Sequence, residues 1–232
     1  SRYEDKDARA NAVEQNYHAA AVPLLSVLPT ASTPLPEERI WTPVTVTGQY
    51  AASGQLLVRG RALNTAQGME VLVPFRVDGG AILLVDRGWV PNGDQAADLP
   101  TVPPAPAGSV TLTGWLKPSE EAREKGLPAG QLATINLEQA QAQIDGRLYA
   151  AYLVLGSESL GAGQQAPPRP AALEQPTPDR GPHFAYALQW WLTALLGAAF
   201  VVYLYRHPPG EPVARVKDPA PKKVRIWDEE DG

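Results

Sequence analysis

The side chains with the clearest chemical potential lie at the start of a long apolar run near the C-terminal end. His183, Tyr186 and Trp190 follow at helical spacing, and with Thr193 and Gly197 they share an arc of about 80° on one helix face. Imidazole is a common axial ligand of haem iron, and a site at a membrane interface keeps a porphyrin in apolar surroundings. The face suits a haem bound through His183, or another helix packed close at Gly197. The alternative is an interfacial histidine whose ring lies among lipid headgroups.

A second candidate is the run Asp86-Arg87-Gly88-Trp89, which ends an apolar segment and precedes a proline. A guanidinium donates paired hydrogen bonds to carboxylates, so Arg87 is a candidate donor to a partner protein or to a haem propionate. The competing interpretation is structural. In it Asp86 pairs with an arginine, Gly88 makes a turn and Trp89 fills the core.

The amino-acid composition excludes several classes of metal site and of function. The 232 residues include no cysteine and three histidines, which excludes disulfides, iron–sulfur clusters, thiolate zinc sites and cysteine-based copper carriers. A net charge of −5 gives no support for nucleic-acid binding, which requires a basic face. No phosphate-binding glycine loop, paired-histidine motif, nucleophile elbow or clustered acid–base site is visible. We therefore expect a protein that is not an enzyme and turns over no small-molecule substrate.

The apolar run after His183 is long enough to cross a membrane. Residues 184–205 carry no charge, and at about 1.5 Å per residue they reach roughly 33 Å, against a hydrocarbon core of about 30 Å. Only Arg169 and Arg180 closely precede the run, whereas six basic residues follow it: Arg206, Arg215, Lys217, Lys222, Lys223 and Arg225. The positive-inside rule places the tail in the cytoplasm, or in the matrix of an organelle, and residues 1–183 outside. Membrane lipid is thus an expected partner.

The elements that must position these side chains are mostly strands. Short runs rich in β-branched and apolar residues occupy 42–50, 55–62, 69–77, 81–90, 109–117 and 148–156. Gly-containing turns between them favour antiparallel hairpins, and Pro74 inside a run predicts an edge or a bulge. Asn136 is expected to cap a short helix over 137–144, and three arginines are assigned to solvated strand faces: Arg59, Arg61 and Arg76. Six or seven strands with one or two small helices indicate an α+β fold with a mainly antiparallel, barrel-like or strongly curled sheet.

These patterns divide the chain into five segments. A polar helix over residues 5–20, followed by a Pro/Ser/Thr stretch, makes residues 1–36 a juxtamembrane helix and lead-in. A β-rich domain outside the membrane follows, and then three further segments: a Pro/Gly-rich linker, the transmembrane helix and a cytoplasmic tail. Their expected bounds are 37–156, 157–182, 183–206 and 207–232.

The first residue is Ser1 and the only methionine is Met69. An outside domain held by a C-terminal span needs a signal that translocates its N-terminus. We therefore expect a signal peptide or a first transmembrane helix before Ser1.

Several of these residues recur in an order found in a known family. They are Trp41-x-Pro43-Val44-x-Val46-x-Gly48-x-Tyr50, Gly68-x-x-Val71-Leu72-x-Pro74, Leu84-Val85-Asp86-Arg87-Gly88-Trp89-Val90-Pro91, Val110-x-Leu112-x-Gly114 and His183-x-x-Tyr186-Ala187-x-x-Trp190. The chain resembles the surfeit-locus family of cytochrome c oxidase assembly proteins over most of residues 39–206. The family carries asparagine before the histidine, whereas this chain has Pro182.

The resemblance implies two transmembrane helices flanking an outside domain, which fits a first helix before Ser1. It also implies a non-catalytic factor that helps to insert haem a into the main oxidase subunit, or to retain it there. Haem a would then be a transient cofactor with His183 as the iron ligand, and Tyr186, Trp190 and Arg87 as further contacts. The expected partners are membrane subunits of cytochrome c oxidase. The Ala/Pro-rich composition favours a bacterial inner membrane over a mitochondrial one. The alternative is a structural subunit of the assembled oxidase that binds no haem.

Overall fold

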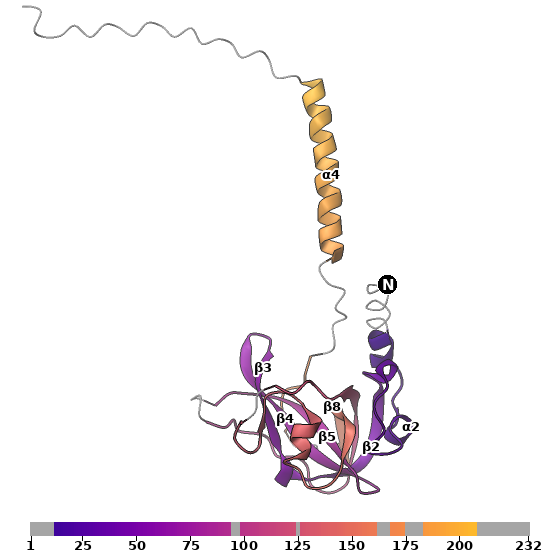
Figure 1. Ribbon diagram of the computed structural model, residues 1–232, viewed down its shortest axis with the longest axis vertical. Coiled ribbons are helices and arrows are strands. Elements are labelled where there is room, and N and C mark those ends of the chain that lie inside the picture. The colour runs from indigo at the N-terminus through magenta and orange to yellow at the C-terminus, as the bar shows by residue number, and fades with distance from the viewer. Residues whose placement is uncertain (1–11, 94–97, 124–125, 162–167, 175–182, 208–232) are drawn as a thin grey trace, which may run out of the picture. The chain divides into compact units, whose positions relative to one another are not determined.

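The computed structural model describes residues 12–93, 98–123, 126–161, 168–174 and 183–207 (Figure 1). The chain forms two compact units, Ser1–Arg180 and Gly181–Gly232. The first unit contains the β-sheet, and the described part of the second is dominated by helix α4. The architecture is therefore mixed, with one large sheet and one long apolar helix.

Six long strands lie where the sequence predicts them. They are β2 (Pro43–Tyr50), β3 (Leu56–Leu63), β4 (Ala66–Val77), β5 (Ile82–Pro91), β6 (Val110–Pro118) and β8 (Leu148–Leu160). The described part of the unit also contains shorter elements: β1 (Val22–Pro23), β7 (Gln131–Leu132), α2 (Leu24–Val27), α3 (Leu137–Gln141), η1 (Glu37–Arg39) and η2 (Ala52–Gly54). Asn136 caps α3 as expected, because its side chain accepts a 3.0 Å hydrogen bond from Gln139 N.

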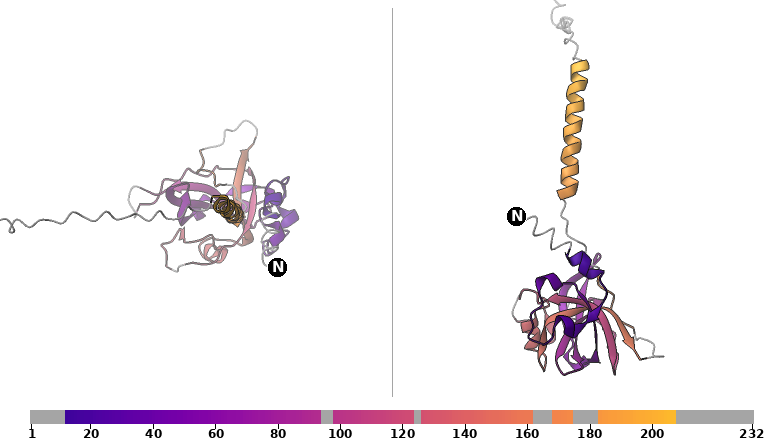
Figure 2. Two further views of the ribbon diagram at one scale, coloured as in Figure 1. Left: turned by 90° about the horizontal axis from the view of Figure 1, so that it is seen from above. Right: turned by 90° about the vertical axis from the view of Figure 1, so that its right-hand side faces the viewer.

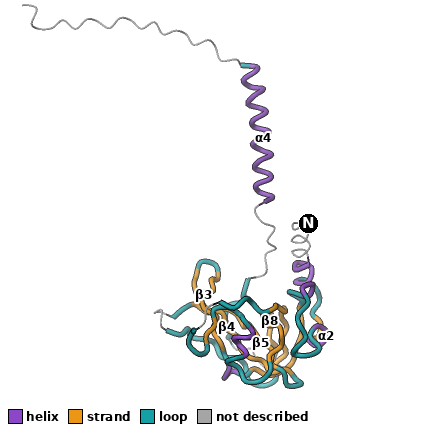
Figure 3. Tube along the Cα trace, viewed as in Figure 1, coloured by secondary structure: helices purple, strands orange, loops and turns teal. Residues whose placement is uncertain are grey.

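The strands form one sheet in the order β1-β2-β6-β8-β5-β4-β3-β7, and β2 also pairs with β4. These pairings join β2, β6, β8, β5 and β4 in a closed circuit, and the ribbon and the Cα tube both show a strongly curved sheet (Figures 2 and 3). Five of the eight pairings are antiparallel, including those of every hairpin. Among the long strands, the one parallel pairing in the described residues is that of β8 with β5, and β8 is antiparallel to β6 on its other side.

Strands β5 and β8 at the centre of the sheet are buried on both faces. Leu83 and Val85 lie in one core cluster with Tyr149 and Leu153, because alternate side chains of a strand point to opposite sides. The alternate residues of the two strands, Ile82, Leu84, Tyr152 and Val154, belong to a second cluster on the other face. Helix α3 and its flanks cover this face with Leu137, Ala140 and Ile144. This second face carries the polar site described below.

Pro74 does not lie at an edge or at a bulge, as its sequence context predicts. It is inside β4 and pairs with Leu84 of β5 on one side. On the other side of β4, the pairing with β3 ends at Leu72 and the pairing with β2 starts at Phe75. Pro74 therefore lies in the gap between these two pairings. A proline fits there because its missing N–H faces no ladder partner.

The expected linker over 157–182 is partly folded. Strand β8 continues to Leu160, and Ala171 returns to Trp89 of β5 with two 2.8 Å backbone hydrogen bonds. Arg169 binds the carbonyl oxygens of Gly156 and Leu155 at 3.0 and 3.3 Å. The sheet domain thus extends beyond residue 156.

A helix is expected over residues 5–20. Of these, residues 12–20 are described, and residues 12–17 are helical. It packs onto the sheet unit, since the Tyr17 ring stacks on that of Trp115 at 4.5 Å and Trp115 Nε1 donates to Tyr17 O at 3.0 Å. Asn16 Nδ2 donates to Glu38 O and Ile40 O. These contacts make the segment part of the folded unit.

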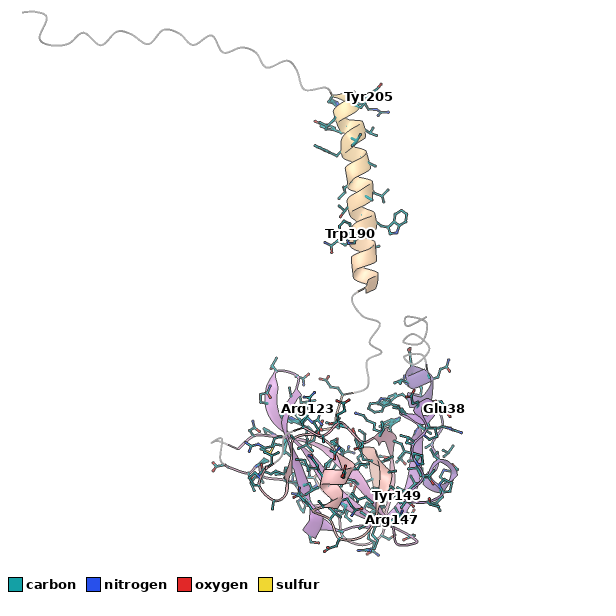
Figure 4. The ribbon with its side chains drawn as sticks, in the orientation of Figure 1. Glu38, Arg123, Arg147, Tyr149, Trp190 and Tyr205 are labelled. Carbon is teal, nitrogen blue, oxygen red and sulfur yellow. The ribbon has the colours of Figure 1, made fainter. Side chains whose placement is uncertain are left out.

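The second unit contains α4 (His183–Arg206). Within the described residues, Leu188–Arg206 is the one helix long and apolar enough to cross a membrane. Its side chains are exposed along its length, and Figure 4 shows Trp190 and Tyr205 towards opposite ends. One candidate membrane helix near the C-terminus is consistent with membrane anchoring, whereas the bounds 183–206 and the helix expected before Ser1 stay predictions.

Candidate functional site

The residues proposed to bind haem lie at the first turns of α4. His183 is its first residue, and Tyr186 and Trp190 follow one and two turns later. The side chains of His183 and Tyr186 lie outside the described part of the chain, whereas Trp190 is 73% exposed. In the described residues, no group of three or more His, Cys, Asp and Glu side chains is placed to hold a metal ion. A haem at His183 stays a prediction.

Arg87 lies inside the sheet unit and has no exposed surface. Its Nη2 donates to Glu158 Oε1 at 2.9 Å and its Nη1 donates to Pro103 O at 3.1 Å. The hydroxyl of Tyr50 donates to the other oxygen of Glu158 at 2.9 Å, whereas Arg87 Nε is buried without a hydrogen-bond partner in the described residues. Because both terminal nitrogens of Arg87 donate hydrogen bonds within the unit, the guanidinium does not present its paired N–H donors to a partner at the surface.

The structural interpretation of this run holds in part. Trp89 fills the core at 8% exposure, and its Nε1 donates to Arg61 O at 3.0 Å. The arginine's partner is Glu158 rather than Asp86, which instead accepts a 3.2 Å hydrogen bond from Gly88 N. Adjacent residues Asp86 and Arg87 thus serve different buried sites.

Asp86 belongs to a polar pocket of about 230 Å³ on the face of the sheet that carries α3. Four strands contribute polar side chains to its wall: Arg61 from β3, Glu70 from β4, Asp86 from β5 and Tyr152 from β8. Lys117 of β6, Glu120 and Glu174 complete the polar lining, and the apolar wall includes Trp41, Ile135, Val154 and Leu173. The residues come from positions 41 to 174, and the sheet brings them together.

The pocket holds more carboxyl groups than cations. Arg61 contacts Glu70 at 3.0 Å and also donates to Glu120, whose same oxygen accepts from Ile135 N at 2.9 Å. Burial raises the pKa of Asp86 well above its usual range, and the nearby Glu70 raises it further. Burial also raises the pKa of Glu70, against the lowering effect of Arg61. Burial and the neighbouring carboxylate thus both favour the protonated form of Asp86.

Two acceptor oxygens at this pocket are buried and have no hydrogen-bond partner in the described residues. They are the Tyr152 hydroxyl and Glu70 Oε2. Glu70 Oε2 is in charge contact with Arg61 Nε, but neither atom makes a hydrogen bond. Burial raises the pKa of Tyr152, which keeps its hydroxyl protonated. Unpaired buried polar atoms are costly and mark a place where a ligand or solvent would be accommodated.

An aromatic wall closes one side of the pocket. Lys117 Nζ lies 5.1 Å from the ring centroid of Trp41 and 5.5 Å from that of Tyr152. Trp41 has a φ of 63°, in the left-handed region that bulky residues rarely adopt. Its backbone N–H donates to Leu116 O at 2.8 Å, which holds the strained residue in place.

Sequence reasoning missed this pocket. Arg61 is paired and half-buried rather than on a solvated strand face, and the acid–base cluster sought in the sequence is present in the structure. The one available signal was Asp86, a charged residue at the end of an otherwise apolar run.

Comparison with known proteins gives a consistent result. The sequence pattern of the SURF1 family matches residues 1–195. Uncharacterized SURF1-like proteins of Mycobacterium bovis and of two Mycobacterium tuberculosis strains are 34% identical to the chain over 190 residues, which covers 78% of the chain and 67% of each relative. The family match contains the whole sheet and the pocket, and it reaches into α4.

Proposed function

Because the chain belongs to the SURF1 family, in general a family of oxidase assembly factors, we propose that it is a membrane-anchored assembly factor for cytochrome c oxidase. The observation that carries the proposal is the match over residues 1–195, which spans the sheet unit and enters α4. The family context indicates assembly rather than catalysis. In this role the sheet unit docks on the oxidase and α4 packs against a membrane subunit.

The proposal includes haem a as a transient ligand of His183. The arrangement of α4 supports it, since the helix begins at His183 and carries the exposed Trp190 two turns later. Imidazole supplies an axial ligand to iron, and neighbouring aromatic rings supply apolar contact for a macrocycle. Arg87 has no part in this site, because its guanidinium is bonded to Glu158 and Pro103.

Spectroscopy of the purified chain tests the haem site. The protein is co-produced with the enzymes of haem a synthesis, purified in detergent and scanned for a Soret band. We expect His183→Ala to lose or shift the band. His207→Ala is the matched control, because His207 follows the other end of α4, where its ring stacks on that of Tyr203 at 4.7 Å. An absent band in the wild type, or one that His183→Ala leaves unchanged, removes haem from the proposal.

Complementation tests the assembly role independently of haem binding. In a bacterium that lacks its own copy of the gene, the chain should restore oxidase activity and the haem a content of the membranes. An assembly factor is absent from the purified, active oxidase, whereas a structural subunit co-purifies in fixed ratio. Co-purification in fixed ratio would therefore favour the alternative of a haem-free accessory subunit.

We place the protein in a bacterial inner membrane with the sheet unit outside and the tail in the cytoplasm. The basic residues after α4 support this orientation. The chain has no cysteine, so a single introduced thiol is a unique label. Ser157→Cys should react with an impermeant maleimide in intact spheroplasts, and Gly232→Cys only after lysis. The reverse pattern would invert the topology.

A further inference from the structure

The polar pocket between β3, β4, β5 and β8 is not used by the proposed haem site. We propose that this pocket binds a primary ammonium group, with Asp86, Glu70 and Tyr152 accepting its three N–H bonds. The proposal is independent of the oxidase role, because it rests on the lining of the pocket alone.

The charge of the pocket leaves room for one more cation. Four carboxyl groups line it, those of Glu70, Asp86, Glu120 and the exposed Glu174, against two cations, Arg61 and Lys117. Arg61 contacts Glu70 and Glu120, and in the described residues Lys117 forms no ion pair but lies over the two rings. A ligand cation would offset part of this excess of carboxyl groups, and a proton carried by Asp86 would then pass to solvent.

The hydrogen-bonding capacity matches an ammonium group. Tyr152 is fully buried and its hydroxyl has no partner in the described residues, and Glu70 Oε2 also lacks a hydrogen bond. Asp86 is 2% exposed and lines the same cavity. These three acceptors equal the three N–H bonds that an alkylammonium donates. Charge-assisted hydrogen bonds of this kind are the strong ones in proteins.

The walls favour an organic cation over a metal ion. No group of three acidic or histidine side chains in the described part of the chain is close enough to bind a metal. Aromatic faces, by contrast, attract alkylammonium ions, and Lys117 already places one near the rings of Trp41 and Tyr152. The cavity of about 230 Å³ has room for a short aliphatic chain behind the nitrogen.

Calorimetry on the full chain in detergent micelles tests the proposal with n-butylammonium chloride. Titration in phosphate and in HEPES, whose ionisation heats differ, gives the number of protons released. We expect saturable binding with up to one proton released per amine near neutral pH. Tetramethylammonium, which has no N–H bond, should bind about tenfold more weakly or worse. Equal binding of the two ions, or no saturable heat with butylammonium, would overturn the proposal without any mutation.

Matched variants locate the site. Asp86→Asn should abolish proton release and weaken binding about tenfold, whereas Asp145→Asn, on an exposed turn, should change neither. Tyr152→Phe should weaken binding several-fold, and Tyr149→Phe on the same strand, outside the pocket, should not (Figure 4 labels Tyr149). Unchanged binding in folded Asp86→Asn and Tyr152→Phe would refute the site.

The same titration distinguishes the source of the amine. A capped lysine peptide offers the ammonium of a partner protein's side chain, and butylammonium represents a free amine. Binding of the peptide at least as tight as that of butylammonium indicates a partner's lysine. Binding of butylammonium alone indicates a small-molecule amine, and both results support an ammonium site.

Discussion

Two adjacent residues of β5 show how the sheet unit accommodates buried charge. Arg87 pairs with Glu158 at 2.9 Å; Arg87 also donates to Pro103 O, and Tyr50 donates to Glu158. Asp86 faces the opposite side, where burial and then the nearby Glu70 raise its pKa and favour its protonated form. Arg87 has an oppositely charged partner and Asp86 has none at hydrogen-bond distance among the described residues, so mutations of the two residues should have different effects.

Arg87→Met should lower the free energy of unfolding by about 3–5 kcal/mol, because it leaves Glu158 buried without its countercharge. Arg59→Met is the matched control: Arg59 is exposed, and its loss should cost no more than about 0.5 kcal/mol. Urea unfolding in detergent, followed by tryptophan fluorescence, measures both. Adding Glu158→Gln to Arg87→Met should recover part of the loss. Equal effects of the two arginine substitutions would contradict the buried pair.

Asp86 should make stability fall as pH rises. Its folded-state pKa is raised above the unfolded value of about 3.9, so above about pH 4 the unfolded chain ionises while the folded chain keeps the proton. The free energy of unfolding then decreases by up to about 1.4 kcal/mol per pH unit. Asp86→Asn should flatten this slope and stabilise the protein at neutral pH, and Asp78→Asn, on an exposed turn, should not. Urea midpoints between about pH 5 and 8 test the slope, which must differ between the wild type and Asp86→Asn.

At the scale of single residues, the packing of a side chain could be predicted from the sequence better than its hydrogen-bond and charge partners. The packing of Trp89 was one of two open interpretations, and it is correct. The pairing of Arg87 with Glu158 could not be predicted, because it depends on the distant β8 lying parallel to β5. The pocket was missed for the same reason, since Arg61, Lys117 and Tyr152 become neighbours only through strand order.

At the scale of elements, the segment after β8 depends on one glycine. Gly88 has a φ of 128°, and a Cβ there would collide with the carbonyl oxygen of Ala171. The close approach permits the paired hydrogen bonds between Trp89 and Ala171. The returning segment also supplies Leu173 and Glu174 to the pocket.

Gly88→Ala should therefore lower the free energy of unfolding by more than the backbone strain of a positive φ alone, which is about 1–3 kcal/mol. Gly60→Ala is the matched control, because Gly60 also has a positive φ, of 68°, but a methyl group there would meet no atom within 4 Å. Hydrogen exchange should show lost protection of the Ala171 amide in Gly88→Ala and unchanged protection in Gly60→Ala. Retained protection in Gly88→Ala would show that the bridge tolerates a side chain.

The strand boundaries themselves were accessible from the sequence. Runs such as 42–50 and 81–90 match β2 and β5 to within a residue, because period-two patterns and glycine turns are local signals. Residues 157–182 were assigned to a linker because their composition is polar and Gly/Pro-rich, yet β8 continues to Leu160 and Ala171 pairs with Trp89. Backbone pairing with a distant strand leaves little trace in composition.

At the scale of the whole molecule, α4 contains the one apolar helix, in the described residues, that is long enough to anchor the chain in a membrane. Leu195 is 63% exposed and lies within the apolar stretch, whereas Leu99, at 61%, lies in a loop of the sheet unit. Leu195→Arg should disfavour membrane insertion by about 2.5–3.5 kcal/mol, and Leu99→Arg should have no effect on insertion. Behind a cleavable secretion signal, carbonate extraction should release more of the Leu195→Arg protein than of Leu99→Arg. Equal retention of both would argue against α4 as the span.

The closed circuit of strands has a consequence for how the sheet unit meets other proteins. In the described residues the ends of the strand order are β1 and β7, each of two residues, and Pro23 of β1 has no N–H to offer. The freer stretch of β3 carries Arg59 and Arg61 and a register shift, which are features that discourage further pairing. Strand addition by an incoming polypeptide is thus a poor mode of recognition here. If the proposed docking on an oxidase takes place, we expect side chains to carry the recognition, so that surface substitutions can separate one partner from another while the sheet stays intact.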